Sequence, residues 1–163
     1  MSVTVHIKYK DFEGIFSGDA NEVWIDVNRF FSQKIPHFTI ARSVLLTVDL
    51  KEVVEASRNI VAVAEEGPVV LVPKKKLTDR ENLLLILLAA YVGGRLGIWE
   101  RLWLNGNELQ VWLGKSGKIT STRLNELSRQ GIVTKTENGG YQLSTYGAKC
   151  LVEEVLPKIK NKI

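Results

Sequence analysis

The first residues of the chain carry the hydrophobic pattern of a β-hairpin. From Val3 to Tyr9 every second residue is apolar, which is the period of a half-buried strand. The polar pair Lys10-Asp11 predicts a turn into a second strand over Phe12–Phe16, which Ser17-Gly18 closes. The sequence therefore predicts two antiparallel strands at the start of the chain.

A helical pattern follows directly. Asp19 is a good N-cap for a helix that runs to about Gln33. This helix has an apolar stripe at helical spacing, made of Val23, Val27, Phe30 and Phe31. A stripe of this kind must pack against something, and the preceding hairpin is the nearest surface.

The rest of the first half continues as mixed α and β structure. Residues 38–48 suit a helix or a strand equally. Asp49, with Glu52 three residues later, resembles a capping box for a helix through about Arg58. A second hairpin is predicted from two apolar segments on either side of a turn, residues 60–64 and 69–72. We therefore expect residues 1–76 to form a small α+β module.

Lys74-Lys75-Lys76 marks the expected boundary between two domains, 1–76 and 77–163. Such a run is typical of a solvated linker, although it could contact phosphate if the second half binds nucleic acid. Thr78 and Glu81 then form a capping box for a helix that contains the ten-residue apolar run Leu83–Val92. A helix that is apolar all round is buried centrally or lies at an oligomer interface. Gly93-Gly94 and Gly97 are expected to end or loosen it.

The segment from Glu108 to Val133 contains the most specific pattern. Leu109, Trp112 and Leu113 are spaced for the buried face of a short helix, which Gly114 stops. Ser116 can cap the next helix, with Leu124 and Leu127 on its inner side and Gly131 at its end. A strand from Ile132-Val133, a turn over residues 137–140 and a strand at Tyr141–Leu143 predict a hairpin. Ser144 or Thr145 then caps a last helix, whose inner stripe is Ala148, Leu151, Val152 and Val155, with Pro157 near its end.

This order of elements resembles the winged helix-turn-helix superfamily, in the style of MarR-, ArsR- and PadR-like regulators and small archaeal DNA-binding proteins. The matching motif is Leu113-Gly114-x-Ser116 followed by Ser121, Leu124, Leu127, Gly131, Ile132 and Val133. The resemblance covers residues 78–158. Thr120 departs from it, because the superfamily usually has a buried aliphatic residue there.

The resemblance implies a recognition helix over residues 117–130 lying in the major groove of DNA. Its outward residues would be Lys118, Ser121, Thr122, Arg123 and Asn125, and Arg or Asn there can read a base edge. Phosphates would be contacted by Lys115, Ser116, Arg129 and Lys135. Lys135 is the only basic residue of the wing, so we expect no minor-groove insertion. The expected function is a DNA-binding transcriptional regulator, and the alternative is a protein-interaction module without base contacts.

The charge distribution agrees with this expectation. The chain has 22 Lys and Arg against 18 Asp and Glu, and the whole surplus lies in residues 77–163. Residues 115–135 alone carry five basic side chains and one acidic, Glu126. A patch of this kind attracts phosphate backbones, although solvated basic faces are common.

Other chemistry is not indicated. His6 and His37 are far from any metal-ligand pattern, so we expect surface or packing roles for them. Cys150 has no partner for a disulfide, and we expect it to be a small buried side chain. No acid–base or nucleophile constellation can be assembled, and we expect neither an enzyme nor a cofactor. The longest apolar run is about half of a membrane span, and the first residues lack the pattern of a secretory signal. A cytoplasmic location is expected.

Three tryptophans, Trp99, Trp103 and Trp112, lie within fourteen residues. Core packing is the first interpretation, and a dimer contact is the second, because Trp is enriched at interfaces. An 80-residue winged domain has little interior for both these rings and the apolar helix. We therefore expect a homodimer through residues 80–104 and the C-terminal helix. The module over residues 1–76 could bind a small molecule or a protein, or add to that interface.

Overall fold

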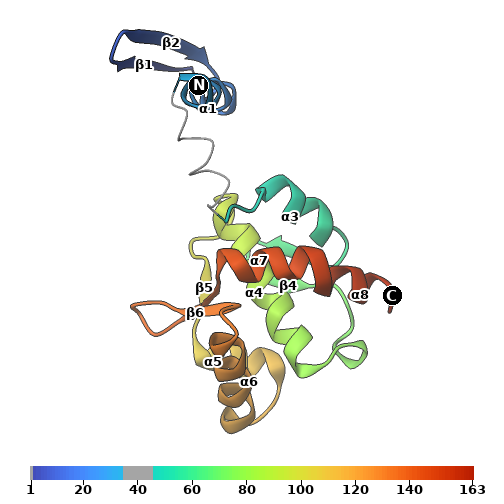
Figure 1. Cartoon of the computed structure of the whole chain (residues 1–163). Coiled ribbons are helices and arrows are strands. Elements are labelled where there is room, and N and C mark those ends of the chain that lie inside the picture. The colour runs from blue at the N-terminus through green and yellow to red at the C-terminus, as the bar shows by residue number, and fades with distance from the viewer. Residues whose placement is uncertain (1, 35–45) are drawn as a thin grey trace. The chain divides into compact units, whose positions relative to one another are not determined.

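The computed structural model describes residues 2–34 and 46–163, which belong to two compact units divided between Leu46 and Thr47 (Figure 1). Both units mix helices with small antiparallel sheets. His37 and most of the ambiguous segment 38–48 lie outside the described residues.

The first unit is the expected hairpin with a helix on it. Strands β1 (Val3–Tyr9) and β2 (Phe12–Gly18) pair antiparallel, and helix α1 spans Ala20–Lys34. The Asp19 carboxylate accepts hydrogen bonds from the backbone N–H groups of Asn21 and Glu22, at 2.8 and 3.1 Å, so the expected N-cap is confirmed. The stripe on α1 faces the hairpin, where the rings of Phe16 and Phe30 meet edge to face at 5.7 Å.

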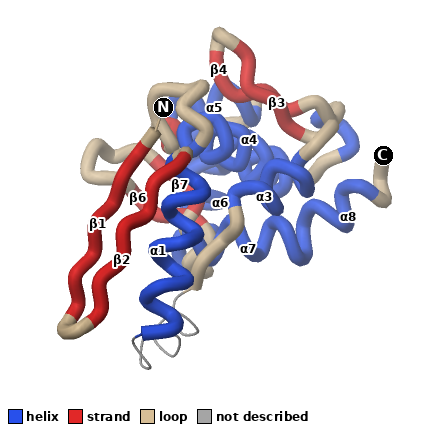
Figure 2. Tube along the Cα trace, turned by 90° about the horizontal axis from the view of Figure 1, so that it is seen from above, coloured by secondary structure: helices blue, strands red, loops and turns tan. Residues whose placement is uncertain are grey.

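The second unit contains the remaining elements. In chain order they are α3 (Leu50–Ser57), β3 (Val61–Ala64), β4 (Gly67–Val70), a 3₁₀ turn (Lys74–Lys76), α4 (Asp79–Arg95), β5 (Trp103–Leu104), α5 (Gly106–Leu113), α6 (Gly117–Arg129), β6 (Val133–Lys135), β7 (Tyr141–Leu143), α7 (Thr145–Cys150), a π-helical turn (Leu151–Val155) and α8 (Leu156–Lys160). Strands β3 and β4 form a two-stranded sheet, and the three others pair in the order β5-β7-β6. Figure 2 shows the helices gathered around α4, with the β3–β4 hairpin at the edge.

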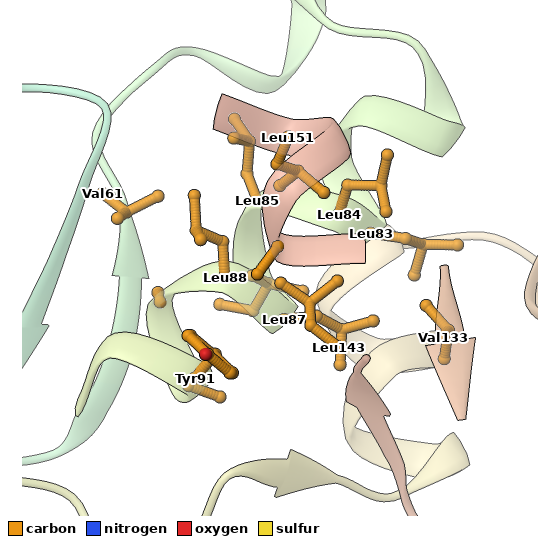
Figure 3. Close-up of a cluster of buried hydrophobic side chains, with 14 of the residues drawn as sticks. Val61, Leu83, Leu84, Leu85, Leu87, Leu88, Tyr91, Val133, Leu143 and Leu151 are labelled. Carbon is orange, nitrogen blue, oxygen red and sulfur yellow. The ribbon is translucent and has the colours of Figure 1, made fainter. Parts of the chain in front are cut away.

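Helix α4 is the centre of the second unit. The capping box between Thr78 and Glu81 starts it as expected, and every residue from Asn82 to Gly93 is buried. Its leucines meet Val61 on one side and Val133, Leu143 and Leu151 on the other (Figure 3). Among the described residues, no helix has the length and apolar character needed to cross a bilayer.

This burial changes two of the expectations. Helix α3 and the β3–β4 hairpin pack on α4, so the compact units divide after Leu46 and not after residue 76. Lys74–Lys76 is a 3₁₀ turn inside the second unit, where a solvated linker was expected. The apolar run of α4 is buried within one chain, so this helix does not need a second copy of the protein to cover it. A homodimer stays a prediction.

Several local expectations need smaller corrections. The second hairpin uses Gly67–Val70, two residues earlier than expected, with Pro68 tolerated because the sheet has only two strands. Asp49 caps α3 through the N–H of Lys51, without a reciprocal bond from Glu52. Pro157 lies near the end of the last helix, as expected, because α8 ends at Lys160. A π-helical turn precedes α8, and a proline is tolerated at the start of a helix because it needs no N–H there.

Candidate nucleic-acid interface

Helices α5 and α6 are joined by a tight turn whose geometry the sequence dictates. Asn105 and Glu108 form a capping box at the start of α5. The helix ends at Gly114, whose φ of 68° is a left-handed conformation that favours glycine. Two residues later the Ser116 hydroxyl accepts the N–H of Ile119 at 3.3 Å and starts α6. The two helices lie side by side at one end of the second unit, and α3 lies at the other end (Figure 1).

The start of α5 is fastened to the segment before it. The guanidinium of Arg101 pairs with the Glu108 carboxylate, which also accepts the N–H of Asn105 at 2.7 Å. The same guanidinium lies between the rings of Trp99 and Trp103, at 5.7 and 4.8 Å from their centroids. These two half-buried tryptophans thus have contacts within the chain, as the packing interpretation expected.

Thr120 occupies the buried side of α6. Its side chain is 2% exposed, beside Leu124 and Leu127, and Ile119 next to it is 42% exposed. The Thr120 hydroxyl donates to the carbonyl of Ser116 at 3.1 Å, so this polar group is satisfied inside the helix. Thr120, Leu124 and Leu127 therefore define the buried face of α6.

All nine residues expected to contact DNA are exposed, and α6 brings most of them to one side. Lys115 and Ser116 lie in the turn, Lys135 lies on β6, and the other six are on α6. Lys118, Thr122, Asn125 and Arg129 follow the spacing i, i+4, i+7, i+11 and form a line along the helix. We call these four residues the α6 line. It lies opposite Leu124 and Leu127, with Ser121 and Arg123 on its two flanks.

Hydrogen bonding separates the free donors from the occupied ones. The Ser121 and Thr122 hydroxyls both donate to the carbonyl of Lys118, at 3.1 and 2.8 Å. The Arg123 guanidinium donates to the Glu126 carboxylate at 3.0 Å. In the described part of the chain, the side chains of Lys118, Asn125 and Arg129 form no hydrogen bond or ion pair. These three are the donors that α6 offers to a ligand.

The hairpin after α6 is short. Strands β6 and β7 pair through Val133 and Leu143, and the turn is closed by Thr136, which bonds to Gly140 through both its backbone and its hydroxyl. The ammonium of Lys135 lies 5.5 Å from the centroid of the Tyr141 ring. Nothing at the tip adds a second basic side chain, so the expectation of no minor-groove insertion stands as a prediction.

Two depressions near these helices were not expected from the sequence. One, of about 190 Å³, lies between α5 and α6, where Asn107, Gln110 and Ser121 supply polar groups. The other, of about 430 Å³, lies on α5 beside Trp112 and Val111, and Val111 is 81% exposed. No local motif signals either one, because each depends on how α5 is placed against its neighbours.

The remaining chemical candidates stay isolated. His6 contacts the Glu13 carboxylate across the first hairpin at 2.5 Å, with both side chains more than half exposed. Cys150 is only half-buried, where a buried side chain was expected, because it lies beside the exposed Tyr146 and not on the inner stripe of α7. A hydrogen bond with Cys150 raises the pKa of the Tyr146 hydroxyl. Within residues 2–34 and 46–163, no group of three His, Cys, Asp or Glu side chains could hold a metal ion.

Comparison with known proteins adds no further constraint. No family model, no curated protein and no solved structure matches this chain. The geometry of α5, α6 and the hairpin that follows them is therefore the basis for inferring a function.

Proposed function

We propose that this protein binds double-stranded DNA through α6, as a winged helix-turn-helix protein that regulates transcription. The observation that carries the proposal is the α6 line, a row of exposed side chains in which Lys118, Asn125 and Arg129 have free donors. The order α4, α5, tight turn, α6 and β6–β7 hairpin supports it, because the sequence resemblance implies this order. Strand β5 adds a third strand to that hairpin, which the sequence did not predict.

The dimensions and chemistry of α6 suit the major groove. An α-helix with its side chains is about 10–12 Å wide, and the major groove of B-DNA is about 12 Å wide. Asn125 carries the amide that reads adenine through two hydrogen bonds, and Arg129 can read guanine or hold a phosphate. Lys115 and Lys118, at the start of the helix, are placed for phosphates, which fix the position of the protein without reading sequence.

Arg123 has a smaller part in this scheme than the sequence implies. It lies on a flank of the α6 line, and its guanidinium is paired with Glu126. Both side chains are more than 40% exposed, so an ion pair of this kind is worth less than about 1 kcal/mol. DNA could therefore displace Glu126 from Arg123 at low cost, but the carboxylate would remain near the phosphates.

Fluorescence anisotropy with a labelled mixed-sequence duplex tests the proposal. Lys118→Ala/Arg129→Ala should weaken binding at least about tenfold, from roughly 1 kcal/mol or more for each lost charge-assisted contact. The matched control is Lys51→Ala/Arg58→Ala, which removes two exposed cations from the α3 region at the far end of the unit. Equal affinity of the two double variants, or no binding by the unmodified chain at low salt, would contradict the proposal.

A protein-interaction module is the second candidate function. It is favoured by the apolar depression beside Trp112, where Val111 is 81% exposed in the middle of α5. Contiguous apolar surface of this kind is typical of protein contacts. This candidate predicts that the protein does not bind the duplex at low salt. It also predicts that the four residues of the α6 line can be replaced by alanine without loss of binding to a partner protein.

A further inference from the structure

The three consecutive lysines before α4 are held in a defined position. Lys74–Lys76 forms a 3₁₀ turn in which the N–H groups of Lys76 and Leu77 bond to the carbonyls of Pro73 and Lys74, each at 3.0 Å. The buried side-chain amide of Asn82 reaches back from α4 and donates to the carbonyls of Thr78, at 3.1 Å, and of Lys74 and Leu77, both at 3.4 Å. A solvated linker would need none of these bonds.

One of these lysines fastens the turn to α5. The Lys74 ammonium donates to the carbonyl of Trp112 near the end of that helix, and it lies 4.0 Å from the centroid of the Trp112 ring. The charge of Lys74 is thus used within the fold, as a cation at a helix C-terminus. Trp112 is three residues before Lys115 in the chain, so the turn lies beside the junction of α5 and α6.

The other two lysines have no such use. Lys75 and Lys76 are exposed, and their ammonium groups contact no acceptor in the part of the chain that the structure describes. The nearest glutamate in sequence, Glu81, is occupied: it pairs with Lys162 at 2.6 Å and completes the capping box with Thr78. Like charges that are held together in a rigid turn repel one another, and an anionic partner relieves this repulsion.

We propose that Lys75 and Lys76 form a second phosphate-contacting site, which binds the backbone of the same DNA beside the groove that α6 occupies. This inference rests on the proposed function. Lys115, in the α5–α6 turn, is three residues after Trp112, to which the lysine turn is fastened through Lys74. The role of the buried Asn82 amide and of the Lys74–Trp112 contact is then to position the two free cations relative to α6.

The salt dependence of duplex binding tests this proposal. The slope of log affinity against log salt falls by about 0.9 for each phosphate contact that is lost. Lys75→Ala/Lys76→Ala should therefore lower the slope by about two, whereas the charge-matched control Lys51→Ala/Arg58→Ala should leave it unchanged. Both double variants alter exposed side chains, and thermal unfolding checks that each one is folded.

The outcomes separate the two proposals. If the Lys75/Lys76 variant keeps the slope of the control while Lys118→Ala/Arg129→Ala weakens binding, the second site is refuted and the proposed function stands. If the unmodified chain shows no salt-dependent binding to the duplex, both proposals fail. Loss of slope in the Lys75/Lys76 variant alone would support this site and contradict the assignment of the α6 line.

Discussion

Replacing Gly147 by alanine should strongly destabilise the second unit. Gly147 lies in the first turn of α7, where the chain returns against the end of α6. A Cβ at this position would lie 2.8 Å from the carbonyl carbon of Ile132 and nearer still to its oxygen. An optimal carbon–carbon contact is about 3.5 Å or more, so this pair alone would have to separate by roughly 0.7 Å, and the closer contact with the oxygen requires a larger shift.

The backbone at this point is not free to move. The N–H of Ser144 donates to the carbonyl of Ile132 at 3.0 Å, and the Ser144 hydroxyl donates to that of Gly131 at 2.6 Å and caps α7. Overpacking costs about 1–3 kcal/mol, and weakening these bonds adds about 1 kcal/mol each. We therefore expect Gly147→Ala to lower the free energy of unfolding by about 3 kcal/mol and Tm by about 10 °C.

Gly106→Ala is the matched control. Gly106 is in the first turn of α5, and a Cβ there meets only the Tyr141 ring, at 3.9 Å. This change should be neutral or should stabilise by up to about 1 kcal/mol, because alanine has the higher helix propensity. Urea unfolding followed by circular dichroism compares the two variants. Equal stability of Gly147→Ala and the unmodified chain would refute the close approach of α7 to the carbonyl of Ile132.

Two further predictions concern carboxylates. Glu126→Gln should tighten duplex binding several-fold, because it frees Arg123 and removes a negative charge near the phosphates, while an exposed pair contributes less than about 1 kcal/mol to stability. Weaker binding in anisotropy would show that Glu126 orients Arg123 productively. Burial alone would raise the pKa of the Glu81 carboxyl, but hydrogen bonds from Lys162 and Thr78 outweigh it and leave this pKa below the usual value. The ionised carboxylate therefore stabilises the fold above pH 4.5, and this contribution is lost as the pH falls through the lowered pKa. The stability difference between the unmodified chain and Glu81→Gln should shrink on acidification, and a constant difference would contradict the pairing.

Local signals in the sequence predicted the elements around the candidate interface. Caps such as Thr78 and Ser116 and the stop at Gly114 depend on side chains and backbone within a few residues, so their spacing alone indicates where helices begin and end. The first hairpin and its helix were predicted for the same reason. The sequence placed Leu124 and Leu127 on the inner side of α6, but only the structure shows that the polar Thr120 is buried beside them.

The features that the sequence did not reveal depend on contacts between distant residues. The division after Leu46 follows from the packing of α3 and the β3–β4 hairpin on α4. The anchoring of Lys74 on Trp112 joins residues that are 38 positions apart. Likewise, composition identifies a basic helix, but only the geometry shows that Arg123 is paired while Lys118 and Arg129 are free.

Mapping the backbone amides that respond to DNA tests DNA binding through α6 most directly. Amide nitrogen–proton correlation spectra of the chain would be recorded while a mixed-sequence duplex is added. We expect shifts concentrated in the α5–α6 turn, along Lys118 to Arg129, and in the turn that carries Lys75 and Lys76. Shifts confined to α5 around Val111, shifts in α3, or no shifts at low salt would contradict DNA binding through α6.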